Sequence, residues 1–591
     1  MFSFFKRNKR LVLLLALVWA ISVILGGCKT TSKEQTSTTP QQTQQTEAKQ
    51  PIPKVAKMVL PLDAVTLDPH VWTWGTHYAR MGIFEGLTKL SPELKPIPAN
   101  AESWEHNSDY TVWTFHLRKD LKWSDGTPLT AHDYEYSFKR AVNPATAAEL
   151  ANDTAFTSVP IKNAEEIRKG VAKIDTLGVK ALDDYTLEIT MAKPWNLLPI
   201  SLAESWAVPV PKHAIEKYGN KDWSLPGNIV SNGPYKVEDF KEGVYLKLVP
   251  NTHYYGKVNL DRIEILKLEN QILPYKNNDI NIATLSEADI EMVDKDPNLK
   301  KEFHLYKTGV VYYMQLLHSE NDILQKNEKV RQAIAMSINK ELIANDIMKG
   351  VVRPGWSVVP EIFAPWGGEI GLKYDPDKAK ELMKEAGFPD GKGFPEITIM
   401  LAGNPAGREL AIADMIKKVT GINVKIVNYE WAKFWEEVNK LQPKDTIGYW
   451  ICGMGPSIAS YLSYVTGSFN LAEMLLPGEK YGELTKIRQD TSIEPGKKLK
   501  MVEEFIYKNT TDVGRQFLDL IEEIKNTSDP VKQEELAKKA AALREEQAAV
   551  IAIDWENAAK LIKPYLKGYV GNPMQLGAPP LYFNDLYVEE K

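Results

Sequence analysis

The stretch "AESWEHNSDYTVWTFHLRKDLKWSDGTPLTAHDYEYSFKRAVNP", Ala101 to Pro144, carries the clearest local pattern in this chain of 591 residues. Near its middle, Trp113, Phe115 and Leu117 are separated by single polar residues, so that apolar and polar side chains alternate. An alternation with a period of two places the apolar side chains on one face of an extended segment. The pattern therefore predicts a strand that buries one face and exposes the other.

Similar patterns continue on both sides of this stretch. "DYTLEITM" (184–191) and "GVYLKLV" (243–249) predict further strands. A helix is predicted over 374–387, where Asp375 suits the N-cap, Pro376 the first helical position and Gly387 the stop. Two more helices are predicted over 329–350 and 530–550. Strands and helices interleave with no obvious linker after residue 53, so the predicted fold class is α/β, or mixed α+β.

The N-terminal residues predict export from the cytoplasm. Lys6, Arg7, Lys9 and Arg10 precede the apolar run "LVLLLALVWAISVIL" (11–25), which leads into "LGGC" ending at Cys28. The small residues before this cysteine resemble a bacterial lipobox. That resemblance implies a signal peptide over 1–27, cleavage before Cys28 and a lipid such as palmitate on its sulfur. The alternative is an ordinary anchor helix with an incidental cysteine.

Residues 28–53 are predicted to be the lipid anchor and a disordered tether. The segment is rich in Thr and Gln and has very few aliphatic residues, so it lacks the apolar surface that a fold requires. Fully extended, it would reach at most ~80 Å from the lipid. A folded part held in this way would stay close to the outer face of the membrane.

Charge and cysteine content exclude several classes of function. Removing residues 1–27 removes four positive charges and no acids, so the formal charge changes from −5 to −9. The folded part has no basic block, and nucleic acid is therefore not an expected partner. Only Cys452 would remain as a thiol, which excludes a disulfide framework within the chain. No cluster of His and Cys residues has the spacing of a metal site.

Catalytic motifs are also missing. There is no P-loop and no HExxH, and "GPSIA" (455–459) lacks the second glycine of a nucleophile elbow. The chain is therefore expected to be no enzyme and to need no cofactor. Residues 446–472, "TIGYWICGMGPSIASYLSYVTGSFNLA", contain no charged residue and no His, although 25% of the chain is charged. Pro, Gly and Ser interrupt this stretch too often for a membrane span.

Several long motifs, in order, are similar to the family-5 extracellular solute-binding proteins, in particular the oligopeptide-binding group of ABC importers. The resemblance extends from about Thr66 to Tyr587. The segments that carry it are "TLDPHVWTWGTHYARMGIFEGLTKL" (66–90), 101–144, "GVKALDDYTLEITMAKP" (178–194), "PVPKHAIEKYG" (209–219), "SNGPYKVEDF" (231–240), "KVRQAIAMSINKELI" (329–343), "GINVKIVNYEWAKF" (421–434) and "LIKPYLKGYVGNP" (561–573).

This resemblance implies a two-lobed, hinge-bending clamp of the periplasmic-binding-protein type with an extra inserted domain. Lobe one would comprise residues 54–85, 212–307 and 563–591, and the inserted domain residues 86–211. Lobe two would comprise residues 308–562. The hinge strands would lie near Thr308 and Ile562.

The implied function is that of a lipid-anchored substrate-binding protein on the outer face of the cell membrane. It would capture oligopeptides by closing its clamp and deliver them to an ABC permease with its ATPase subunits, acting as a monomer. An oligosaccharide is the alternative ligand, because some members of the family bind sugars and exposed tryptophans can stack on sugar rings. Another solute remains a third possibility.

The resemblance also implies which residues contact the ligand. From lobe two these would be Trp431, Trp450, Cys452, Gly453 and Met454, and from lobe one Trp72, Trp74 and Thr284. In the family, the segment that matches 446–472 lines the cleft, and a cleft that accepts many ligands would avoid fixed charges there. Cys452 is interpreted as a small apolar wall residue because no base neighbours it in sequence.

The chain departs from the family pattern at the place where the ligand's amino group binds. Peptide binders of this group commonly carry an Asp two or three residues after the Trp that matches Trp450, and this Asp pairs with the α-amino group. Here Cys452 and Gly453 stand in its place. A ligand-contacting Tyr and an acidic residue of the family likewise correspond to Leu150 and Thr73. The sequence therefore predicts that blocking the amino terminus of a peptide costs little affinity.

Overall fold

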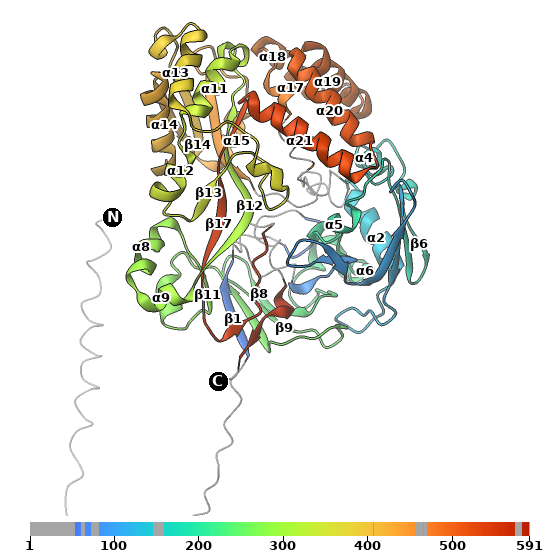
Figure 1. The fold of residues 1–591 in the computed structure, drawn as a ribbon. Helices are drawn as coiled ribbons and strands as arrows, with labels where there is room; N and C mark the ends of the chain where they lie inside the picture. The colour runs from blue at the N-terminus through green and yellow to red at the C-terminus, as the bar shows by residue number, and fades with distance from the viewer. Residues whose placement is uncertain are drawn as a thin grey trace, which may run out of the picture. The chain divides into compact units, whose positions relative to one another are not determined.

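A computed structural model describes residues 54–60, 66–71, 82–145, 159–405, 407–454, 462, 465, 470–573 and 582–589. Its largest feature is an 11-stranded sheet (Figure 1). In spatial order the strands are β15 (Val424–Tyr429), β14 (Ile397–Ala402), β16 (Gly448–Met454), β12 (Phe303–Leu316), β17 (Val550–Ile562), β11 (Ile282–Thr284), β1 (Val55–Val59), β10 (Arg262–Leu266), β9 (Tyr245–Pro250) and β8 (Tyr235–Lys241), and β13 (Val352–Pro354) pairs with β17.

The antiparallel pair β12 and β17 lies at the centre of this sheet and belongs to both of its halves. The first half of β12 pairs with the second half of β17, and β17 also pairs there with β11. The other ends of the two strands pair with each other beside β16 and β13. Figure 1 shows the two strands running together between the halves. The register shifts between Lys307 and Val311, and again between Tyr312 and Tyr313, which marks bulges in the crossing segment.

A separate antiparallel sheet has the strand order β4 (Ala101–His106), β5 (Val112–Leu117), β7 (Thr186–Thr190) and β6 (Val179–Asp183). The strand predicted at Trp113, Phe115 and Leu117 is β5, and all three side chains are buried, as the alternation predicted. The predicted strands at 184–191 and 243–249 are β7 and β9. Helix α2 (Ala131–Val142) packs against this sheet, and Asp133 caps it by accepting a hydrogen bond from the Thr130 N–H.

The remaining small sheets pair β2 (Thr88–Leu90) with β3 (Pro96–Pro98) and β18 (Leu566–Lys567) with β19 (Tyr587–Val588). Helices occupy both faces of the large sheet (Figure 1). The main ones are α6 (Lys212–Asp222), α8 (Glu287–Lys295), α9 (Pro297–Glu302), α11 (Glu328–Ser337), α13 (Pro376–Glu385), α14 (Gly407–Thr420), α15 (Trp431–Val438), α18 (Gly478–Gln489), α19 (Pro495–Asn509), α20 (Asp512–Asn526) and α21 (Pro530–Glu546). The mixed α/β class is confirmed.

Two of the three predicted helices end earlier than the sequence pattern indicates. The helix predicted over 329–350 breaks after Ser337, because Ile338 takes an extended conformation and Asn339 caps a new short helix at the Leu342 N–H. The helix predicted over 530–550 ends at Glu546, and strand β17 starts at Val550. The predicted helix with Asp375 as its N-cap is α13, whose Lys378 N–H donates to the Asp375 carboxylate.

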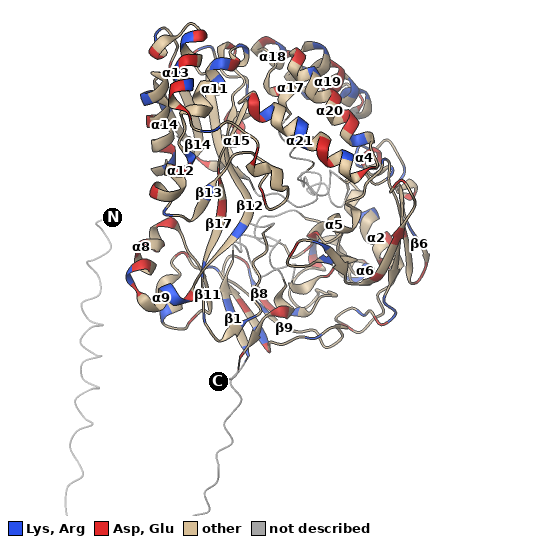
Figure 2. Cartoon of the chain, viewed as in Figure 1, with Lys and Arg blue, Asp and Glu red and all other residues tan. Residues whose placement is uncertain are grey.

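The buried apolar residues form several clusters. One cluster includes buried residues of β5, β7, β1, β9 and β10, so the four-stranded sheet and this half of the large sheet share one continuous apolar core. A second packs α11, α13 and α14 against β14, and a third packs α15, α20 and α21 against β12, β16 and β17. Acidic and basic residues are both frequent along α13 and α18–α21 (Figure 2), whereas β14 and β16 contain no charged residue.

Candidate functional site

Strand β16 carries four of the predicted ligand-contacting residues. Its first four residues pair with β14 on one side, and the residues from Tyr449 onward pair with β12 on the other. Among the described strands, none pairs with residues 452–454 on the side opposite β12. Gly453 is exposed there. A short length of backbone is therefore left without a strand partner in the middle of the sheet, a place where an extended ligand can add itself as a strand.

Trp450 is largely buried by other aromatic rings. Its exposed fraction is 8%, and it makes edge contacts with Tyr313, Phe434 and Trp435 at centroid distances of 5.4, 6.1 and 5.7 Å. In this structure, most of its surface supports the packing of α15 against the sheet. Its predicted role as a wall of the ligand site stays a prediction.

Trp431 has the opposite environment. It is the first residue of α15, and 49% of its surface is exposed. Its ring stacks on Phe434 at a centroid distance of 6.2 Å and contacts Trp435 edge-on at 5.8 Å, so two aromatic side chains hold it in position. An exposed ring held in a fixed position can contact a ligand with little loss of side-chain entropy.

Cys452 is buried, with an exposed fraction of 8%, and its thiol donates to the carbonyl oxygen of Gly453 at 3.3 Å. Burial raises the pKa of this thiol to about 11, and the nearby Glu556 contributes in the same direction. The thiol is therefore protonated at neutral pH, which agrees with its interpretation as an apolar wall residue and not a nucleophile.

The carboxylate of Glu556, on β17, lies beside Gly453. A Cβ atom added to Gly453 would lie 3.8 Å from Glu556 Oε1 and 3.3 Å from the ring of Tyr312. The chain lacks the family's aspartate at this position, but a carboxylate from β17, a strand distant in sequence, lies close to it. The prediction that blocking the amino terminus of a peptide costs little affinity rests on the lack of a carboxylate in residues 446–472. The pairing of β12 with both β16 and β17 brings the carboxylate of Glu556 close to this segment.

Below this position lies a group of buried charges centred on Arg408 of α14. Its guanidinium donates to Asp554 Oδ2 at 3.0 Å and to Glu409 Oε1 at 3.2 Å, and it stacks on Tyr312 with its centre 3.2 Å from the ring centroid. The Tyr312 hydroxyl donates to Glu409 at 2.7 Å. Arginine is suited to such a site because its planar head both stacks and donates several hydrogen bonds.

The acidic groups of this site are harder to ionise than usual. Burial raises the pKa of Asp554 to about 6 despite its pairing with Arg408. Burial, followed by repulsion from Asp554, raises the pKa of Glu556 to about 7. Burial opposes the charge of Arg408, but attraction to Asp554, Tyr312 and Glu409 outweighs it and raises the pKa of the guanidinium. Arg408 therefore stays protonated, and the carboxyl groups around it, Asp554 and Glu556, ionise less readily than exposed ones.

Thr284, predicted from lobe one, lies at the end of β11 and is tied to the protein itself. Its hydroxyl accepts a hydrogen bond from Lys560 Nζ at 2.7 Å, and its backbone N–H donates to Gln271. Lys560 is 1% exposed, and burial lowers the pKa of its ammonium group to about 7. The two predicted hinge residues are also on the central strands: Thr308 donates to the carbonyl oxygen of Glu556 at 2.8 Å, and Ile562 pairs with Ile282 of β11.

The other predicted residues cannot be placed. Five of them lie outside the described residues: Cys28, Trp72, Thr73, Trp74 and Leu150. Of Met454 only the backbone is described, as the last residue of β16. Within the part of the chain that the structure describes, no helix is long and apolar enough to cross a bilayer. No group of His, Cys, Asp and Glu side chains in that part is arranged to hold a metal ion.

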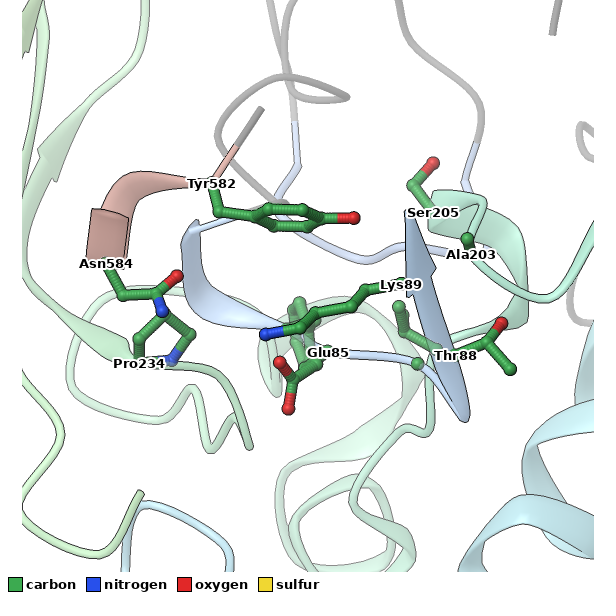
Figure 3. A pocket seen from close by; sticks show the side chains of 11 residues that line it. Glu85, Thr88, Lys89, Ala203, Ser205, Pro234, Tyr582 and Asn584 are labelled. Carbon is green, nitrogen blue, oxygen red and sulfur yellow. The ribbon is translucent and has the colours of Figure 1, made fainter. Parts of the chain in front are cut away.

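A pocket that the sequence did not indicate lies near β2 (Figure 3). Its lining includes Glu85, Thr88, Lys89, Ser205, Tyr582 and Asn584. Two of these are fixed by internal contacts, since the Leu90 N–H donates to the Tyr582 hydroxyl at 2.6 Å and Tyr254 donates to Glu85 at 2.9 Å. None of the predicted ligand-contacting residues lines this pocket.

Comparisons with known proteins relate this geometry to a family. Residues 95–471 match the model of the bacterial extracellular solute-binding proteins, family 5. The periplasmic oligopeptide-binding protein OppA of Escherichia coli is 31% identical over 513 residues, which cover 83% of this chain and 84% of the relative.

Two solved structures have a similar fold. The oligopeptide ABC transporter substrate-binding domain from Bacillus anthracis has a TM-score of 0.66 and 25% identity, and the match covers 91% of this chain and 99% of that one. Haemophilus influenzae OppA, solved in complex with RPPGFSPFR, has a TM-score of 0.67 and 22% identity, with the same coverage. These likenesses confirm the expected two-lobed binding-protein fold.

Proposed function

Because the chain belongs to family 5 of the bacterial extracellular solute-binding proteins, we propose that it is the substrate-binding component of an ABC importer that takes up oligopeptides. Proteins of this family bind solutes and are not enzymes. The main support is the match over 83% of the chain to a relative that is named as an oligopeptide-binding protein. The Bacillus anthracis structure supports the partnership with an ABC transporter, because it is described as the substrate-binding domain of one.

The geometry of β16 agrees with a peptide ligand. The backbone of residues 452–454 has no described strand partner opposite β12, and Gly453 is exposed. A peptide that pairs there would be bound through groups that every peptide shares, so its affinity would depend weakly on its side chains. The uncharged residues 446–472 suit the same purpose, because they offer no charge that would select one ligand sequence.

We propose the domain division that the sequence indicated: lobe one from 54–85, 212–307 and 563–591, the inserted domain from 86–211, and lobe two from 308–562. The central pair β12 and β17 supports it, because these strands belong to both halves of the large sheet. The ligand stabilises the closed clamp to the extent that it contacts the closed state better than the open one.

The chain is proposed to act as a monomer held at the outer face of the membrane by a lipid on Cys28. The support for the lipid is the sequence "LGGC" followed by a long polar tether. A tethered binding protein stays close to its permease, which raises the local concentration of captured ligand.

Calorimetry with short peptides and with β-linked oligosaccharides of similar size tests this function. We expect saturable binding of peptides, and we expect a strain that lacks the chain to lose uptake of the same peptides. Binding of oligosaccharides with no binding of peptides would replace the peptide proposal by a sugar-binding one. Unchanged peptide uptake without the chain would contradict its role in an importer.

A further inference from the structure

We propose that Glu556 binds an ammonium group of the ligand beside Gly453, the α-ammonium group of a peptide in the first place. This inference rests on the proposed function, because it assigns a residue to the recognition of peptide ligands. Glu556 comes from β17 and lies far in sequence from the uncharged segment that ends near Ala472. It would supply the counter-charge that this segment lacks.

The position of the carboxylate is the first argument. Glu556 is half-buried, and this burial is the main cause that raises the pKa of its carboxyl group. Its Oε1 is 3.8 Å from the point that a Cβ atom of Gly453 would occupy, and Gly453 is exposed at the strand end that has no described partner opposite β12. A peptide that pairs with this backbone would therefore have its first residues within reach of the carboxylate.

The lack of a partner is the second argument. Among the described residues, no donor hydrogen-bonds to the Glu556 carboxyl group and no cation forms a direct ion pair with it, although Arg408 is near enough to lower its pKa. The backbone carbonyl of Glu556 accepts from Thr308 and Arg353. Arg408 donates to Asp554 and Glu409. A half-buried carboxyl group without a protein donor is open to a donor from a ligand, and an ammonium group supplies up to three.

The balance of charge is the third argument. Asp554, Glu409 and Glu556 surround one guanidinium, that of Arg408, and Glu287 at the start of α8 adds further repulsion on Glu556. The site is therefore short of positive charge. An anionic ligand group would meet repulsion here, whereas a cation would be attracted more strongly than in water because the site is largely screened from solvent.

The competition with protons gives the proposal a measurable signature. Burial, together with repulsion from Asp554, raises the pKa of Glu556 to about 7, so the free site is partly protonated at neutral pH. An ammonium group binds the ionised form and lowers that pKa, so binding releases a proton. Affinity for a free amine should therefore rise as pH increases toward 7 and fall again above about pH 8, where the α-ammonium group itself loses its proton. The titratable groups that face Glu556 are Asp554 (β17), Arg408 and Glu409 (α14), Tyr312 (β12), Cys452 (β16) and Glu287 (α8).

The test compares a tetrapeptide without Lys, the same peptide with an acetylated amino terminus, and an acetylated peptide with one Lys side chain. Calorimetry measures all three with the unsubstituted protein, with Glu556→Gln and with Glu188→Gln. The last variant changes a half-buried glutamate of β7, in the separate four-stranded sheet, and leaves the carboxylate beside Gly453. We expect the unsubstituted protein and Glu188→Gln to prefer the free amine by more than about tenfold, and Glu556→Gln to lose most of that preference.

Two further outcomes are decisive. Adding Gly453→Asp to Glu556→Gln should restore the preference, since it places a carboxylate at the same point. In the unsubstituted protein, affinity for the free amine, but not for the acetylated peptide, should fall by up to about tenfold per pH unit below pH 7. This last measurement needs no variant and holds even if Glu556→Gln folds poorly.

An unchanged preference in Glu556→Gln, or no preference in the unsubstituted protein, overturns the inference while peptide binding itself stands. Preference for the acetylated Lys peptide over the free amine would overturn the assignment to the α-ammonium group. No binding of any of the three peptides overturns the proposed function together with this inference.

Discussion

Lys560 shows how a single buried charge affects the pH dependence of stability. Its ammonium group is 1% exposed and has Thr284 as its hydrogen-bond partner, and burial lowers its pKa to about 7 from an ordinary value of 10.5. Between these two values the unfolded chain binds the proton and the folded protein does not. Folding is therefore penalised fully below pH 7, and the penalty disappears as pH rises from 7 toward 10.5.

We predict that Lys560→Met raises the free energy of unfolding by about 1–3 kcal/mol at pH 6 and by clearly less at pH 9. Chemical denaturation of both proteins at the two pH values measures this difference. Lys301→Met, a substitution at an exposed lysine of α9, serves as the control and should show no such dependence on pH. Equal effects of Lys560→Met at both pH values would show that the charge contributes nothing to the stability of the fold.

The two tryptophans of lobe two allow packing to be separated from ligand contact. Trp450 is 8% exposed within an aromatic cluster, whereas Trp431 is 49% exposed. We predict that Trp450→Ala lowers the free energy of unfolding by about 3–5 kcal/mol, as for other buried tryptophans. Trp431→Ala should change it by less than about 1 kcal/mol and weaken peptide binding. Thermal denaturation and calorimetry decide between these roles, and unaltered affinity in Trp431→Ala would remove Trp431 from the site.

Sequence reasoning pointed to candidate site residues that share one segment, and it did not indicate Glu556, which comes from another part of the chain. Trp450, Cys452 and Gly453 stand out because their surroundings are uncharged. Glu556 carries no such signal, because it sits in a strand whose neighbours are unremarkable in sequence. Its closeness to Gly453 depends on β12 pairing with both β16 and β17, and such non-local pairing cannot be calculated from local periodicity.

At the scale of the element, β16 depends on one glycine at its start. Gly448 has φ of +142°, and a Cβ atom there would lie 2.0 Å from the carbonyl oxygen of Thr398 on β14. No side chain fits between the two parallel strands at this point. The close approach sets the register that carries Trp450 and Gly453 to their places.

We predict that Gly448→Ala lowers the free energy of unfolding by at least about 2 kcal/mol and reduces peptide affinity in the fraction that still folds. Gly482→Ala, in helix α18, is the control, because its added Cβ atom would meet the flexible end of Leu441 at 3.2 Å. Its stability should stay within about 1 kcal/mol of the unsubstituted protein. Thermal denaturation measures both variants, and equal stability of the two would contradict this role of Gly448.

Local patterns predicted elements well where the cause of the element is local. The alternation around Phe115 gives β5, and the cap at Asp375 gives α13. The helix pattern over 329–350 failed at Ile338, which keeps its apolar stripe but takes an extended conformation. A side-chain pattern reports which face is buried, and it does not report whether the backbone turns between two buried residues.

At the scale of the whole molecule, the prediction of two lobes came from the family resemblance and not from the residues themselves, and the order of strands in the large sheet was not predicted. β12 and β17 pair although β13, β14, β15 and β16 lie between them in sequence. Such a pairing stabilises the fold only after the entropy cost of closing a long loop has been overcome. The local sequence of either strand therefore does not indicate its partner. The lobe boundaries, which follow from this pairing, stay a prediction.

The proposed lipid anchor at Cys28 can be tested separately from ligand binding. We predict that Cys28→Ser abolishes lipid attachment and leaves peptide affinity unchanged, because the tether separates Cys28 from the folded part. Detergent phase partitioning of the processed protein measures the first effect and calorimetry the second. A Cys28→Ser protein that still partitions with membranes after processing would show that something other than this cysteine holds it there.

The burial of Cys452 has a practical consequence for labelling. The chain has 2 cysteines, so a Cys28→Ser protein keeps Cys452 as its single thiol. That thiol is 8% exposed and has a pKa of about 11, so only about one molecule in ten thousand carries the reactive thiolate at pH 7. Cysteines introduced at the exposed Lys301 of α9 and Lys425 of β15 would therefore react with maleimide dyes ahead of it. Energy transfer between the two dyes would then follow the opening and closing of the clamp in solution without removal of the native thiol from the ligand site.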